Sequence, residues 1–183
     1  MSGSITEVVV AVVGIGGTLA SALLTQLSAN RVRLREVEKA DEQRTRELDR
    51  AAHEAGLEAR RACYAGLNAA ALDYVTVLDN FSYAVEAGRV TDDLRAELYQ
   101  ARRAHRSVHA DAQMLLSASV MVAADRVGKS LGQVYRMLKR LDGGTPEAGD
   151  DIATARQGMA TLWDHLWVMR RDMRRDLGLG DDA

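Results

Sequence analysis

Two histidines one helical turn apart are the side chains of this sequence that most resemble a metal-binding pair. His105 and His109 stand four residues apart, so a helix would carry both imidazoles on one face, as in zinc sites. Arg106 occupies the position that glutamate takes in a His-Glu-x-x-His metalloprotease. His105 also falls on an apolar seam, where a hydrogen-bonded core histidine is the ordinary arrangement. We therefore predict no metal site and keep the two histidines only as candidates.

Other reactive side chains do not form a known catalytic motif. Asp125 or Asp164 with His165 would suit acid–base chemistry, but helix surfaces carry such pairs by chance. Cys63 is the only cysteine, so neither an intramolecular disulfide nor a Cys-x-x-Cys pair can form. The net charge is −2, which gives no global basic field for nucleic acid. We predict a protein that is not an enzyme, takes no cofactor and does not bind nucleic acid.

A glycine cluster near the N-terminus could belong to a nucleotide-binding loop. The stretch "VVVAVVGIGGTLASALLTQL" covers Val8–Leu27 and begins like a buried strand that runs into a glycine turn. Gly14 and Gly16 match the dinucleotide fingerprint, but Leu19 stands where a small residue must let the helix pack on the strand. No second strand-like run follows to complete a βαβ unit. The dinucleotide-dependent enzyme is therefore the less favoured alternative.

The same stretch has the length and composition of one bilayer crossing. Residues 8–27 carry no formal charge, and about 20 apolar residues span roughly 30 Å of hydrocarbon. The basic residues follow the stretch, which excludes the positive leading region of a signal peptide and favours an outside N-terminus with the bulk of the chain in the cytoplasm. A buried central helix of a soluble bundle is the alternative. In a membrane helix, small residues at spacings of three and four would form one face against which a partner helix could pack. The alternative is that they are scattered on a single anchoring helix. These residues are Gly14, Gly17, Ser21 and Thr25.

A highly charged segment follows the apolar stretch. Residues 31–62 contain nine basic and eight acidic side chains, no proline and a single glycine. The apolar seam there is thin, and Asp41 and Arg44 stand where a coiled coil would need hydrophobic residues. We predict a solvated helical stalk, with a weak coiled coil as the alternative.

The rest of the chain carries four apolar seams with helical spacing, which predict helices that bury one face. Short loops make consecutive helices antiparallel neighbours. The helix ends are marked by Gly88, by Thr91 as an N-cap, by Gly143 and Gly144, and by Thr145 before Pro146. A slip in spacing near Ser117 predicts a further turn, with one kinked helix as the alternative. The seams are Leu57, Tyr64, Leu67, Ala71, Tyr74, Leu78, Phe81 and Val85; Leu94, Leu98, Ala101, His105, Val108, Ala112 and Leu115; Val120, Ala124, Val127, Leu131, Val134, Leu138 and Leu141; and Ile152, Ala155, Met159, Leu162, Leu166, Met169 and Met173.

Two tryptophans flank the fourth seam. Trp163 and Trp167 stand four residues apart, so they either widen the buried face or form a docking patch, since tryptophan is favoured as a binding anchor. Arg170, Arg171 and Arg174 follow on the same helix and could meet an acidic partner or the inner leaflet. We predict a candidate partner surface made of these five residues.

Several stretches resemble a group of small, uncharacterised, single-pass membrane-anchored helical proteins of high-GC Gram-positive bacteria. They are "GIGGTLASALLTQ", the arginine-rich stalk, "RRACYAGLNAAALDY" and "MRRDMRRDLG". The resemblance covers most of the length and implies this layout, but it brings no activity or ligand.

Together these features predict an all-α protein with an N-terminal transmembrane helix, a charged helical stalk and an antiparallel four-helix bundle. The expected division is 1–7 as a short extracytoplasmic N-terminus, 8–27 as the span, 28–62 as the stalk, 63–177 as the cytoplasmic bundle and 178–183 as an acidic tail. The expected location is the cell inner membrane. The expected function is a membrane-anchored adaptor, scaffold or regulatory protein with a protein partner; a structural homo-oligomer, or a metal- or nucleotide-dependent enzyme, is the alternative.

Overall fold

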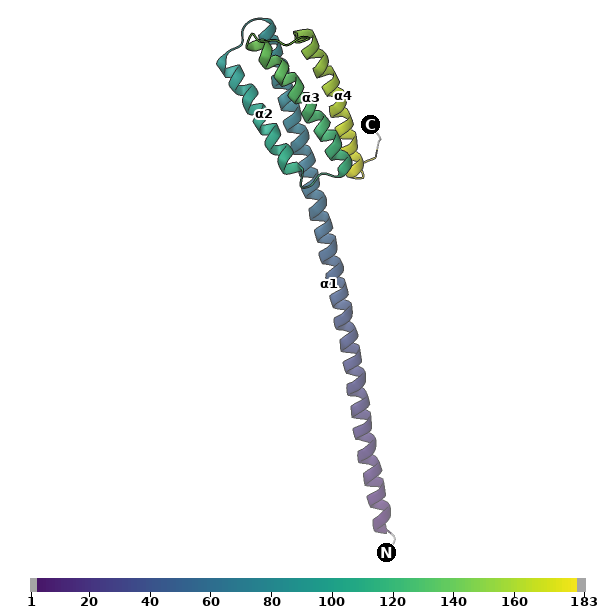
Figure 1. Cartoon of the computed structure of the whole chain (residues 1–183). Coiled ribbons are helices and arrows are strands. Elements are labelled where there is room, and N and C mark those ends of the chain that lie inside the picture. The colour runs from purple at the N-terminus through teal and green to yellow at the C-terminus, as the bar shows by residue number, and fades with distance from the viewer. Residues whose placement is uncertain (1–2, 181–183) are drawn as a thin grey trace. The chain divides into compact units, whose positions relative to one another are not determined.

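Every regular element of the described chain is a helix. The computed structural model describes the backbone of residues 3–180 and the side chains of residues 39–180. The helices are α1 (Gly3–Glu86), α2 (Asp92–Ala112), α3 (Ala118–Asp142) and α4 (Ile152–Asp176) (Figure 1). The all-α prediction is therefore confirmed. The dinucleotide alternative needed a strand at residues 8–13, which lie within α1.

The chain divides into two units, residues 1–54 and residues 55–183. In the first unit, the side chains of residues 39–54 are exposed. Arg46 pairs with Glu42 one turn earlier at 3.2 Å, and an exposed pair of this kind adds only a few tenths of a kcal/mol. Residues 39–54 are thus a solvated helical segment, as expected for the stalk.

The predicted membrane span lies outside the part of the chain whose side chains are described. Residues 8–27 and the small residues Gly14, Gly17, Ser21 and Thr25 all fall there. Within the described part, no helix offers a stretch long and apolar enough to cross a bilayer. The membrane location therefore stays a prediction from the sequence.

The second unit is a helical bundle made by α2, α3, α4 and the part of α1 from residue 55 onward (Figure 1). The four predicted seams supply its core, because each helix buries only one stripe. The predicted burial of Leu115 in the second seam is wrong: the residue is exposed because α2 ends before it. The most deeply buried large side chains are Phe81, Leu67, Leu78, Leu98, Leu131, Leu138, Leu162, Leu166, Met169, Val120 and Val127.

Contacts between side chains far apart in sequence show that α1 and α4 are antiparallel. The hydroxyl of Tyr64 donates to the carboxylate of Asp176 at 2.6 Å, which joins the bundle's first turns of α1 to the end of α4. At the other end, Arg156 near the start of α4 donates to Glu86 at the end of α1, at 2.6 and 3.1 Å. Both pairs hold the two helices in one register.

A second set of contacts makes α2 antiparallel to α3. Arg95 in the first turn of α2 donates two hydrogen bonds to Asp142, the last residue of α3, at 2.9 and 3.0 Å. The Arg95 guanidinium lowers the pKa of the Asp142 carboxyl from its usual value. At the opposite ends of the two helices, His109 lies 3.2 Å from Asp125.

The predicted helix boundaries before α2 and α3 are confirmed. Gly88 has a φ of 60° after α1, a conformation that glycine adopts without the usual penalty, and the hydroxyl of Thr91 accepts from the amide of Leu94 at 3.3 Å. Residues 113–117 separate α2 from α3, so the region is two helices and not one kinked helix. Ser117 is the N-cap residue, but its side chain makes no capping hydrogen bond.

The predicted start of the last helix is wrong. Thr145 and Pro146 lie in the loop, and the N-cap is Asp151, whose carboxylate accepts from the amide of Thr154 at 2.6 Å. Aspartate caps at least as well as threonine, and Asp151 directly precedes the apolar seam. The chain uses the cap adjacent to the residues that it must bury.

Candidate functional site

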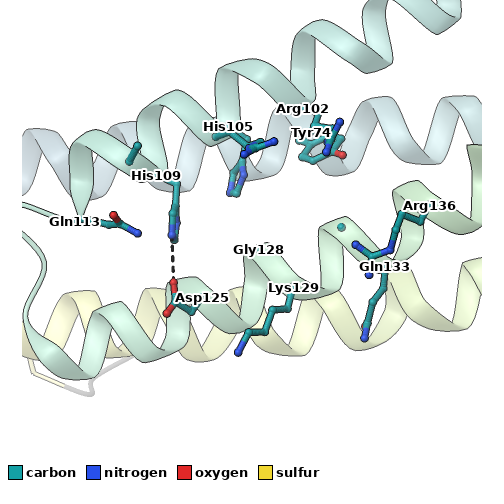
Figure 2. Close-up of a pocket in the computed structure, with 13 residues that line it drawn as sticks. Tyr74, Arg102, His105, His109, Gln113, Asp125, Gly128, Lys129, Gln133 and Arg136 are labelled. Atoms are coloured by element: carbon teal, nitrogen blue, oxygen red, sulfur yellow. Dashed lines mark ion pairs between the residues drawn. The ribbon is translucent and has the colours of Figure 1, made fainter.

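A cavity of about 680 Å³ opens between α2 and α3, and Tyr74 of α1 forms part of its wall (Figure 2). Gly128 and Gly132 line it from α3 one turn apart. Because neither has a side chain, His105 and Arg136 can lie close to the backbone of α3: a Cβ built at Gly128 would be 4.0 Å from the His105 ring, and one at Gly132 would be 3.4 Å from the Arg136 guanidinium. The volume falls within the range of about 300–1,000 Å³ that is typical of small-molecule sites.

Among the Arg, Lys, Asp and Glu residues that line the cavity, cations predominate. Asp125 is the single carboxylate among its lining residues. None of the four lining cations forms an ion pair with another residue between 39 and 180. One guanidinium, that of Arg102, lies 4.6 Å from the centre of the Tyr135 ring. The four cations are Arg102, Arg106, Lys129 and Arg136.

The two candidate metal ligands face this cavity from α2. His105 is 5% exposed, and its ring lies 5.9 Å from that of His109. His109 contacts Asp125 through Nε2 at 3.2 Å. Burial, and then the nearby His109, lower the pKa of His105 to about 4, so its imidazole is neutral at neutral pH. Between residues 39 and 180, no group of three or more His, Cys, Asp or Glu side chains is arranged to hold a metal ion.

The predicted burial of His105 is confirmed, but the predicted hydrogen bond is not found in the described part of the chain. Its neighbours are aromatic rings instead: Tyr74 lies 5.9 Å away on α1, tilted by 42°. The ring therefore takes part in packing and also borders the cavity.

Tyr74, which lines the cavity, has a hydroxyl without a hydrogen-bond partner within residues 39–180. The residue is 2% exposed, and its hydroxyl oxygen is buried with no hydrogen-bond partner among the described residues. A buried polar group without a partner costs about 1–3 kcal/mol. Burial raises the pKa of Tyr74, with the nearby Arg102 acting in the opposite direction. The hydroxyl therefore stays protonated and able to donate.

The tryptophans of α4 lie on the surface of the bundle. Trp163 is 48% exposed and Trp167 is 54% exposed, so the interpretation that they widen the buried face is wrong. The guanidinium of Arg171 lies over the Trp167 ring at 5.2 Å. Helical spacing puts Arg170 and Arg174 on the same side as the indoles, and neither forms an ion pair within residues 39–180. We call these five residues the tryptophan–arginine surface.

A polar pair between α3 and α4 was not predicted. The hydroxyl of Ser130 lies 2.9 Å from Nδ1 of His165, and Ser130 is buried. The pair satisfies a polar group that the packing of the two helices would otherwise isolate. Asp164 is exposed and makes no contact with His165 in the described structure, so the suggested acid–base pair is not assembled.

The cationic cavity was missed by the sequence analysis. Only two weak sequence features could have indicated it: Arg102 and Arg106 are one turn apart on one helix, and Gly128 and Gly132 are one turn apart on another. Spacing alone could not show that the two helices face each other.

Comparison with known proteins returned no relatives. No protein-family model, no curated protein and no solved structure matches this chain.

Proposed function

We propose that this protein is a membrane-anchored helical adaptor whose bundle binds an acidic segment of a protein partner through the tryptophan–arginine surface. The exposure of Trp163 and Trp167 carries the proposal. An indole left half in water retains apolar area that a partner can cover, and tryptophan and arginine are the residues most enriched at binding hot spots.

The charge of this surface supports an acidic partner. Arg170 and Arg174 have no ion pair within residues 39–180, so their guanidinium groups can pair with carboxylates of another chain. Arg171 is already held over Trp167 and lies 3.6 Å from Asp172. An arginine held in place loses less entropy when a partner binds.

Anchoring rests on the sequence alone. The uncharged stretch 8–27 and the basic residues that follow it favour one crossing with the bundle in the cytoplasm. Cell fractionation tests this part: full-length protein recovered in the soluble phase without detergent would contradict it.

Site-specific crosslinking tests the partner surface. A photoreactive amino acid at Trp167 should give a discrete crosslinked protein, whereas the same group at Tyr99, a similarly exposed aromatic residue on α2, should not. Arg170→Glu with Arg174→Glu should abolish the crosslink at Trp167, because a reversed charge repels an acidic segment. Arg126→Glu, an exposed arginine on α3, is the matched control.

Three outcomes would contradict the adaptor. Equal crosslinking at Tyr99 and Trp167 would mean that the surface has no selectivity. A product of twice the chain's mass would show that the chain binds itself, as the homo-oligomer alternative expects. Crosslinks to lipid alone would show that the surface faces the membrane.

A further inference from the structure

We propose that the cavity between α2 and α3 binds a small organic phosphate that carries two or more negative charges. The cavity is separate from the tryptophan–arginine surface, with which it shares no residue. This site extends the proposed adaptor function and does not depend on it.

The arrangement of the cations favours a ligand with more than one anionic group. Arg102 and Arg106 line the cavity from α2, and Lys129 and Arg136 line it from α3. The positions of Lys129 and Arg136 are separated by roughly 10 Å along the helix axis. One phosphate group is too small to reach the cations along this length, whereas two linked phosphate groups, or a phosphate with a second anionic group, can do so.

The single carboxylate lies at one end of the cavity. Figure 2 shows His109 and Asp125 facing each other there, with Tyr74, Arg102 and Arg136 toward the other end. Nε2 of His109 lies 3.2 Å from the Asp125 carboxylate, so this carboxylate is in contact with His109 at its own end of the cavity. We infer that the anionic groups bind toward the end that holds Tyr74.

Tyr74 supplies an observation independent of charge. Tyr74 lines the cavity, and its buried hydroxyl lacks a hydrogen-bond partner among residues 39–180. Such groups are rare in folded proteins because they lose their bonds to water. A phosphate oxygen is a strong acceptor, so a bound phosphate would satisfy this donor while the guanidinium groups neutralise the charge.

Pyrophosphate is the probe for a direct test. Titration calorimetry of the full chain in neutral detergent should show saturable binding at constant ionic strength. Arg102→Gln with Arg136→Gln should weaken it roughly tenfold or more, the usual effect of losing charged hydrogen bonds. Tyr74→Phe keeps the ring and removes only the hydroxyl, and should weaken binding roughly fivefold.

Matched variants separate a built site from general attraction to positive charge. Arg103→Gln with Arg126→Gln removes two exposed arginines from the same helices that do not line the cavity, and should leave the affinity unchanged. Circular dichroism confirms that each variant is folded. Absence of saturable binding, or equal weakening by both double variants, would overturn the proposal.

The phosphate could belong to a soluble metabolite or to a lipid headgroup. The full chain in phosphatidylcholine bilayers, with and without diacylglycerol pyrophosphate, whose headgroup has two linked phosphate groups, distinguishes the two sources. Pyrophosphate binding that this lipid weakens identifies a lipid headgroup, and binding that it leaves unchanged identifies a free phosphate. Both results support the site and assign its source.

Discussion

His105 should make the stability of the bundle depend on pH over a defined interval. The imidazole is 5% exposed, and its pKa in the folded chain is lowered to about 4, first by burial and then by His109. In the unfolded chain its pKa is about 6.5. Between these values the unfolded chain takes up a proton that the folded chain does not, so acidification favours unfolding.

The magnitude follows from the separation of the two pKa values. Each pH unit between them is worth about 1.4 kcal/mol, so His105 alone should lower the free energy of unfolding by roughly 3 kcal/mol as the pH falls from 6.5 to 4. The neutral imidazole contributes fully to the free energy of unfolding above pH 6.5, and this contribution is lost as the pH falls to about 4. For a bundle of this size, that is a large part of the total stability of about 5–15 kcal/mol.

Urea denaturation of the full chain in neutral detergent, monitored by far-ultraviolet circular dichroism at several pH values, measures how the free energy of unfolding changes with pH. His105→Phe retains an aromatic ring beside Tyr74 and cannot take up a proton, so the dependence on pH should be much flatter. His53→Gln, at an exposed position of α1, should follow the original chain. A His105→Phe slope equal to that of the original chain would refute the reasoning, because it would mean that the folded bundle protonates His105 as readily as the unfolded chain does.

Two further pairs of substitutions test the helices. Gly66→Ala has open space around the new methyl group and should raise the free energy of unfolding by about 1 kcal/mol. Gly158→Ala would bring its Cβ to 3.0 Å from Cγ2 of buried Val134; this overpacking costs about 2 kcal/mol, exceeds the gain of about 1 kcal/mol in helix propensity, and should lower the free energy of unfolding by roughly 1 kcal/mol. A gain in the same denaturation assay would contradict this packing. Asp151→Ala should cost about 1 kcal/mol and Thr145→Ala almost nothing, and equal losses would mean that the cap is misassigned.

Short-range sequence features predicted much of the helical architecture. Apolar spacing of three and four residues predicted which face of each helix is buried, because that spacing reports directly on the helical period. Glycine at 88 and threonine at 91 predicted a boundary, since both act on the backbone within a few residues. Where two local signals competed, as between Thr145 and Asp151, the sequence offered no measure of which cap would lie beside the packed seam.

The sites depended on contacts between helices. Sequence spacing places Trp163 and Trp167 beside the apolar seam of their helix, and this position is the same whether the indoles are buried or exposed. Only the neighbouring helices determine how far their contact surface extends beyond the seam. Tyr74 likewise belongs to an apolar seam, and nothing local shows that it lines a cavity or that its hydroxyl lacks a partner among the described residues.

The sequence by itself determined the helices, most of their ends and the residues of the core, because propensity, capping and periodicity are properties of neighbouring positions. Tertiary structure alone decided that cations from α2 and α3 line one cavity and that two indoles remain half in water. The physical reason is that charge concentration and exposure are set by distances between segments far apart in the chain, and helical periodicity carries no information about those distances.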